Sequence, residues 1–147
     1  MIAGFTIEAT IRRPVEDVFR VLTDVELSER WFPARIHETW TSPPPHGVGS
    51  TRHAVVTVMG RRSENDATVT EYDPPRRAVL AAELQGMRWT AALDFHDTGD
   101  ATRVAFDFAA DASGPMRLAV GPFLWWYRRA WQRGLATLAR MMEAGSL

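Results

Sequence analysis

The sequence predicts an α+β protein in which an antiparallel sheet of about seven strands wraps around one long C-terminal helix. Residues 3–12 alternate between apolar and polar side chains, which is the pattern of a half-buried strand. Residues 35–111 contain short strand-like segments separated by turn signals, and the pattern becomes helical from residue 116 to residue 144. Strands that follow one another through short turns favour an antiparallel sheet over alternating strands and helices.

Two short helices are expected after the first strand. The segment RPVEDVFRVLTD places Pro14 at a helix start, Glu16 and Asp17 in the first turn, and apolar residues at helical spacing. The segment VELSERWF is typical of a second helix, which Pro33 would end.

The remaining strands are separated by turn signals that are rich in Gly, Pro or Asp. These breaks are SPPPHGVG, GR, DPPR, QG and TGDA. The strands are expected at residues 35–42, 50–59, 62–72, 77–84, 87–97 and 102–111.

Length and composition predict one globular domain over residues 1–147. The chain is 46% hydrophobic and 24% charged, and its net charge of −1 argues against a nucleic-acid-binding protein. No apolar run approaches the roughly 20 residues of a membrane span. The segment MIAGFTIEAT has no basic region and contains Glu8, so no signal peptide and a cytoplasmic location are expected.

No metal site and no cofactor are predicted. The chain has no cysteine, and its four histidines form neither an HxH nor an HExxH pair. The segment HGVGST resembles a phosphate-binding loop only superficially, because such a loop needs a lysine and the chain has none.

The C-terminal helix carries aromatic residues on its inward face. At about 100° per residue, Phe123, Tyr127, Ala130 and Gly134 share this face, and Trp126 lies at its edge. Core packing is the plain interpretation. However, small residues in the middle of an aromatic face also describe a concavity. The facing strands mix alanine with large side chains in the same way, which indicates a lined pocket: Trp89, Ala91, Leu93, Phe106 and Phe108.

Two polar residues are expected to point inward from the strands. His53 shares strand parity with Val55 and Thr57, and it is either a hydrogen-bonded interior residue or a catalyst. Glu83 has the same ambiguity, and in the interior it would need a partner or a wet cavity.

Five segments in this order resemble the SRPBCC (START-like, helix-grip) superfamily, and in particular its polyketide cyclase/dehydrase-like branch. They are IRRPVEDVFRVLTDVELSERWFP, GVGSTRHAVVTVMG, VTEYDPPRRAV, DATRVAF and the closing helix. The resemblance implies a curved sheet that grips the C-terminal helix, a hydrophobic ligand cavity between them, and two short helices at one end. Members of the superfamily include lipid and hormone carriers, aromatase/cyclases and chaperone activators. No catalytic constellation of the superfamily is recognisable in this chain.

Three functions remain open. The first is binding of a hydrophobic or aromatic, lipid-like or polyketide-like small molecule. The second is a polyketide cyclase or dehydratase in which His53 acts as general acid or base and Tyr127 or Thr57 orients a carbonyl. The third is a protein-interaction module, with outward-facing Trp125 as the anchor of a homodimer. The predicted ligand-binding residues are Trp40, His53, Val55, Thr57, Trp89, Ala91, Leu93, Phe106, Phe108, Phe123, Trp126, Tyr127, Ala130 and Gly134.

The pocket hypothesis makes a specific prediction for Gly134. If Gly134 and Ala130 border a cavity, Gly134→Leu fills the void, abolishes ligand uptake and leaves the fold intact. If Gly134 instead permits a close contact of the helix, the same substitution destabilises the protein.

Overall fold

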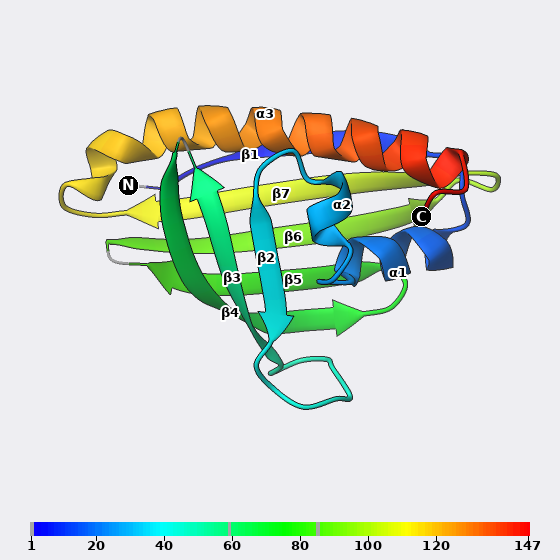
Figure 1. Ribbon diagram of the computed structural model, residues 1–147, viewed down its shortest axis with the longest axis horizontal. Coiled ribbons are helices and arrows are strands. Elements are labelled where there is room, and N and C mark those ends of the chain that lie inside the picture. The colour runs from blue at the N-terminus through cyan, green and yellow to red at the C-terminus, as the bar shows by residue number, and fades with distance from the viewer. Residues whose placement is uncertain (1, 59, 85) are drawn as a thin grey trace.

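Seven strands and three helices make up the described part of the chain, in the predicted order (Figure 1). The computed structural model describes residues 2–58, 60–84 and 86–147. The strands are β1 (Ile2–Ile11), β2 (Ile36–Trp40), β3 (Thr51–Val58), β4 (Arg61–Asp73), β5 (Arg77–Leu84), β6 (Met87–Asp97) and β7 (Thr102–Ala112). The helices are α1 (Val15–Thr23), α2 (Ser28–Trp31) and α3 (Met116–Glu143).

All seven strands form one antiparallel sheet in the order β1-β7-β6-β5-β4-β3-β2. Strands β2 to β7 are sequential neighbours joined by turns, and the first strand pairs with the last along its whole length. The sheet curves so that β2, β3 and the first part of β4 cross in front of β5, β6 and β7 (Figure 1). The predicted α+β helix-grip architecture is therefore confirmed. Residue 59, the expected end of one strand, lies outside the described residues.

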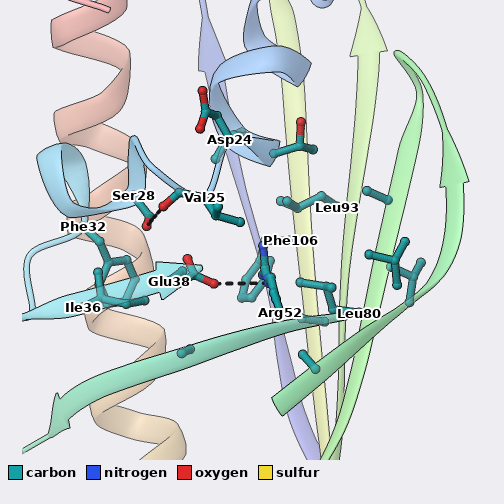
Figure 2. Close-up of a pocket in the computed structure, with 18 of the residues that line it drawn as sticks. Asp24, Val25, Ser28, Phe32, Ile36, Glu38, Arg52, Leu80, Leu93 and Phe106 are labelled. Atoms are coloured by element: carbon teal, nitrogen blue, oxygen red, sulfur yellow. Dashed lines mark hydrogen bonds and ion pairs between the residues drawn. The ribbon is translucent and has the colours of Figure 1, made fainter. Parts of the chain in front are cut away.

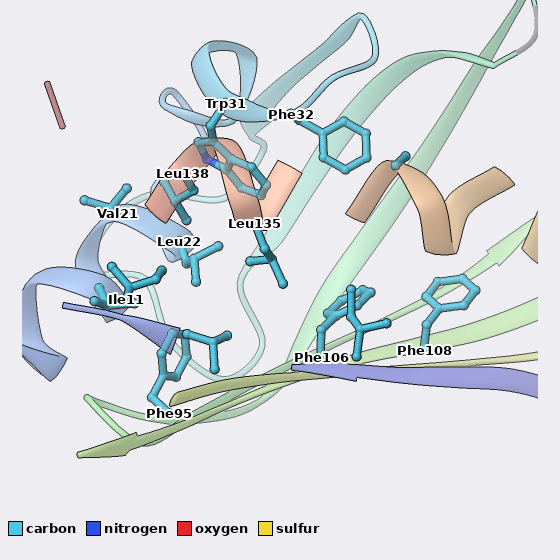
Figure 3. Packing of buried hydrophobic residues seen from close by; sticks show 14 of the residues in the cluster. Ile11, Val21, Leu22, Trp31, Phe32, Phe95, Phe106, Phe108, Leu135 and Leu138 are labelled. Carbon is cyan, nitrogen blue, oxygen red and sulfur yellow. The ribbon is translucent and has the colours of Figure 1, made fainter. Parts of the chain in front are cut away.

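The two short helices lie near one end of α3 and close that end of the sheet (Figure 1). Helix α1 buries Val18, Val21 and Leu22, and its two acids occupy the first turn, where they interact favourably with the helix dipole. Helix α2 is a single turn, shorter than the predicted segment. It nevertheless buries Trp31, which joins the main hydrophobic core (Figure 3).

The core lies between the inward face of the sheet and the three helices. Alternate residues of β7 are buried, as the period of a strand with one covered face requires. Leu135 and Leu138 of α3 meet side chains of β1, α1 and α2 (Figure 3). The aromatic face of α3 thus packs on the sheet, as its amphipathic pattern predicts.

Gly134 does not border a void. A Cβ atom added there would lie 3.1 Å from Cζ3 of Trp31 and 3.3 Å from Cδ of Pro33. Such distances are shorter than ordinary van der Waals contact, so glycine allows α3 to approach the α2 segment closely. The expectation that Gly134 borders a cavity is therefore wrong. The small residue is needed for a helix-to-helix contact, which the helical pattern alone could not distinguish from a hollow.

Candidate binding cavity

A cavity of about 150 Å3 lies between the inward face of β2 to β7, the side of α3 and the α1–α2 segment. Figure 2 shows side chains from the strands and from the α1–α2 segment converging on it. Its walls are mostly apolar and aromatic, as in typical small-molecule sites. The walls comprise Leu22, Val25, Trp31, Phe32, Ile36, Trp40, Ala54, Val56, Ala67, Val69, Ala78, Val79, Leu80, Trp89, Ala91, Leu93, Phe106, Tyr127 and Trp131.

Six of the predicted binding residues line this cavity: Trp40, Trp89, Ala91, Leu93, Phe106 and Tyr127. Trp89, Ala91 and Leu93 alternate along β6, and Phe106 lies directly opposite Leu93 on β7. Residues two apart in a strand share a face of the sheet. Once one of these residues is assigned to the inward face, the others on the same strand are assigned to it as well.

The other predicted residues of β7 and α3 belong to the packing beside the cavity. The ring of Phe108 is buried against Tyr127, with ring centroids 4.8 Å apart, and Phe123 stacks on Tyr127 at 5.2 Å. Trp126 also stacks on Tyr127, with ring centroids 6.2 Å apart, and Ala130 is buried in the core. None of these four, nor Gly134, lines the cavity. The α3 aromatics are therefore partly core, and only Tyr127 and Trp131 reach the cavity wall.

Strand β3 has the opposite parity from the one predicted. Its cavity-facing residues are Arg52, Ala54 and Val56, so His53, Val55 and Thr57 do not line the cavity. Both alternating sets of β3 side chains contain apolar residues, and one of them also contains the charged Arg52. Alternation alone therefore does not show which set faces the interior. The sheet register resolves this ambiguity, because it places Arg52 opposite Trp40 on β2.

His53 instead lies on the outward side between two acids of β4. Its Nδ1 is 2.8 Å from Oδ1 of Asp66, and its Nε2 is 3.1 Å from Oε1 of Glu64. Glu83 also points outward and pairs with Arg88 at 2.5 Å. Neither residue is placed to act on a molecule in the cavity, so the predicted inward orientation of His53 is wrong.

The environment of His53 predicts a pH-dependent contribution to stability. Hydrogen bonds to Asp66 and then Glu64 raise the pKa of His53 above its ordinary value of 6.5. A raised pKa in the folded state means that protonated His53 stabilises the fold. This stabilisation is fully present below pH 6.5 and is lost as the pH rises through the raised pKa.

We therefore expect His53→Gln to destabilise the protein more at about pH 5.5 than at about pH 9. Denaturant unfolding of both proteins at the two pH values measures this difference. His96→Gln is the control, because His96 is exposed and has no ion pair with a described carboxylate. Equal destabilisation by His53→Gln at both pH values would contradict the expectation.

A buried ion pair forms the polar part of the cavity. Nε of Arg52 lies 3.2 Å from Oε2 of Glu38 (Figure 2), and only 17% and 10% of the two side chains are exposed. Glu38 and Arg52 lie diagonally across neighbouring strands on the same face, which brings such side chains within reach. Because each charge would be costly to bury alone, the pair is best understood as one neutral, polar unit in an apolar wall.

Three buried N–H groups of cavity-lining residues lack hydrogen-bond partners within the described residues. They are Nε of Arg52, Nε1 of Trp31 and Nε1 of Trp131, the last of which lies near the Tyr127 hydroxyl without the geometry of a hydrogen bond. The Arg52 contact with Glu38 is an ion pair without the geometry of a hydrogen bond. Buried hydrogen-bond donors in folded proteins almost always have acceptors. Three unpartnered donors on residues that line one cavity therefore favour a ligand that carries a hydrogen-bond acceptor.

Tyr127 adds a hydroxyl to this end of the cavity. Burial raises the pKa of Tyr127 to about 12, an effect that the nearby indole of Trp131 only partly opposes. The phenol therefore stays neutral at physiological pH and is suited to donating a hydrogen bond rather than to accepting a proton.

The β2–β3 loop covers another part of the cavity. The imidazole of His46 stacks on the indole of Trp40 with ring centroids 3.9 Å apart and an interplanar angle of 10°. Tyr72 reaches the cavity because a bulge in β4 between Val69 and Glu71 shifts the alternation of its side chains. Sequence reasoning missed His46, because it lies in a loop with no periodic pattern.

Sequence reasoning also missed Glu38 and Arg52. The available signal was a charged residue on each of two neighbouring strands, on faces that otherwise carry apolar residues. Within the ranges that the structure covers, no group of three or more histidines and acids is arranged to hold a metal ion.

A family model described as "Polyketide cyclase / dehydrase and lipid transport" matches residues 3–143. The chain belongs to this family. The uncharacterized protein Rv2574 from Mycobacterium tuberculosis is 28% identical over 133 residues, which are 88% of this chain and 78% of that protein. Within the described residues, no helix has the length and apolar character needed to cross a membrane.

Solved structures show the same fold at low identity. TTHA0849 from Thermus thermophilus has a TM-score of 0.80 and 18% identity, covering 99% of this chain and 100% of that one. DynU16, a protein of the dynemicin biosynthetic locus, has a TM-score of 0.66 and 18% identity, covering 97% of this chain and 48% of that one. These likenesses establish the fold of this family member and leave its ligand to be argued from the cavity.

Proposed function

We propose that this protein binds a hydrophobic or aromatic small molecule that carries a neutral hydrogen-bond acceptor, such as a ketone, ester or amide carbonyl. The observation that carries the proposal is an apolar cavity with three unpartnered buried N–H donors in its lining residues. Burial of the apolar part against the aromatic walls supplies affinity at about 25 cal/mol per Å2. The acceptor fixes the orientation, because an unpaired buried donor is costly.

The charge balance favours a neutral acceptor over an anion. Glu38 already balances the charge of Arg52 at 3.2 Å. A carboxylate placed beside the guanidinium would also lie close to Glu38, and like charges in a poorly solvated site disfavour each other. A carbonyl oxygen accepts from Arg52 or an indole without that repulsion.

Filling the cavity is expected to abolish uptake. Ala91 of β6 lines the cavity, whereas its neighbour Ala92 belongs to the outer surface of the sheet. We expect Ala91→Phe to eliminate quenching of tryptophan fluorescence by 2-acetylnaphthalene. Ala92→Phe, the matched control, should bind as the wild type does. Retained binding by a folded Ala91→Phe protein would contradict occupancy of this cavity.

A pair of ligands tests the role of the acceptor. 2-Acetylnaphthalene and 2-ethylnaphthalene have similar apolar parts and differ in the carbonyl oxygen. We expect the ketone to bind about tenfold more tightly, the scale of one hydrogen bond to a charged donor. The preference should disappear in the double variant Glu38→Leu, Arg52→Met. Equal affinity of the two ligands for the wild type would refute the acceptor and leave hydrophobic binding in place.

A cyclase or dehydratase activity is a second candidate, supported by the family description. The histidine available to such chemistry is His46 rather than His53, because His46 lines the cavity. Its Nε2 lies 3.2 Å from the carbonyl oxygen of Ser42, an arrangement that leaves Nδ1 as the proton acceptor. If turnover of a polyketide-like substrate is found, His46→Ala should abolish it and His53→Ala should not.

A further inference from the structure

The outward face of α3 has an unusual charge distribution. Residues 116–142 contain five arginines and no acid, whereas the remaining 120 residues contain 12 arginines and all 18 acids of the chain. The net charge of −1 is therefore the sum of a strongly basic helical segment and an acidic remainder of the chain. Such an asymmetry is typical of proteins that bind an anionic surface.

Two large apolar side chains lie in the middle of this basic face. Leu118 is 87% exposed and Trp125 is 64% exposed. They are seven residues apart and lie along one line of the helix, with Gln132 continuing that line. The side of α3 opposite the sheet is not covered by another element (Figure 1). We call this strip and the arginines beside it the α3 face.

The arginines flank the apolar strip on both sides. Arg117 and Arg128 lie on one side of the strip at 100° per residue, and Arg129, Arg133 and Arg140 lie on the other. None of the five has a carboxylate partner among the described residues. The guanidinium of Arg129 lies 5.1 Å from the Trp125 ring centroid, and Arg140 contacts only Thr137.

We propose that the α3 face docks on an anionic lipid surface. An apolar strip flanked by arginines is the pattern of a helix that lies in the membrane interface. The apolar side chains enter the acyl boundary and the arginines meet the headgroup phosphates. The proposal concerns the outside of the protein, so it is independent of the ligand that the cavity binds.

Other partners satisfy only part of this pattern. A symmetric dimer through Trp125 would bring two sets of five arginines together without any acid to balance them. A nucleic acid would pair with the arginines, but its phosphate backbone offers little to Leu118 and Trp125. An anionic bilayer uses both the charge and the apolar strip.

Co-sedimentation of the full-length protein with lipid vesicles tests the proposal. We expect binding at low ionic strength to vesicles of phosphatidylcholine mixed with phosphatidylglycerol and much weaker binding to phosphatidylcholine alone. The double variant Arg128→Glu, Arg133→Glu should lower partitioning by about 30-fold or more. Trp125→Ala should lower it by about tenfold. Thermal melts should show that these exposed substitutions leave the fold intact.

The controls carry the same chemical changes elsewhere on the surface. Arg20→Glu with Arg61→Glu makes the same change of net charge on α1 and β4, and Val48→Ala removes a side chain that is 69% exposed. These variants should bind vesicles nearly as the wild type does. Equal losses in controls and α3 variants would overturn the proposal. It would also be overturned if the wild type did not bind the mixed vesicles. In that case, α3 variants that convert a dimer to a monomer, or that lose binding to a DNA duplex, would identify the other partner.

Discussion

Replacing Gly134 by leucine is expected to lower the free energy of unfolding by about 1–2 kcal/mol. A Cβ atom at this position would already press on the indole of Trp31 and the ring of Pro33 at 3.1 and 3.3 Å. The branched part of leucine would have to displace Trp31, which is only 4% exposed and held in the core. Overpacking of this kind costs about 1–3 kcal/mol, and the better helix propensity of leucine offsets less than 1 kcal/mol.

Thermal unfolding measures this effect, with an expected fall of about 3–7 °C in melting temperature for a domain of this size. Gly121 provides the control in the same helix, because a Cβ there would meet no atom within 4 Å apart from its chain neighbours and the backbone of its own helix. We expect Gly121→Leu to change the stability by about 1 kcal/mol or less. An unchanged melting temperature for Gly134→Leu would show that the α2 segment can move away and that the close contact is dispensable.

Arg52→Met is expected to destabilise the protein by about 3 kcal/mol. The substitution leaves the carboxylate of Glu38 in an apolar wall with only 10% of its side chain exposed. An uncompensated buried charge is far more costly than the loss of one ion-pair contact. Chemical denaturation of the two proteins at neutral pH gives the difference directly.

The double variant Glu38→Leu, Arg52→Met separates this cost from the value of the pair. With both charges replaced by apolar side chains, we expect stability within about 1 kcal/mol of the wild type. Arg76→Met is the matched control, because its pair with Asp73 is exposed to 71% and 59% and its loss should hardly change the stability. If Arg52→Met cost no more than Arg76→Met, the pair would have to be well solvated, and the acceptor site proposed beside it would lose its basis.

The predictable parts of the fold are those with local signals. The bounds of β5 and β6 agree with the predicted segments 77–84 and 87–97, because the turns on both sides contain Gly, Pro or Asp. The β6 residues that form the floor of the cavity could also be predicted from a local pattern. On β6 the large apolar residues all share one parity, so Trp89, Ala91 and Leu93 could be placed on one face from the sequence alone.

Parity was not decidable where both faces of a strand contain apolar residues. On β3, Val55 and Val56 point to opposite sides, and the charged Arg52 belongs to the buried side. Its partner Glu38 lies 14 positions earlier, on a strand whose register depends on the whole sheet. Sequence reasoning therefore chose His53 for the interior and missed the ion pair that distinguishes this cavity.

The sequence by itself determined the order of the elements, the antiparallel sheet, the amphipathic long helix and the apolar floor of a cavity. These follow from periodicity and turn residues, which act over a few positions. The tertiary structure decided what Gly134 contacts, which face of β3 is buried, and that Trp31, Arg52 and Trp131, which carry the unpartnered donors, line one cavity. These features depend on distances between segments far apart in the chain. These distances are set by the packing of all segments together, so they cannot be predicted from a pattern of neighbouring residues.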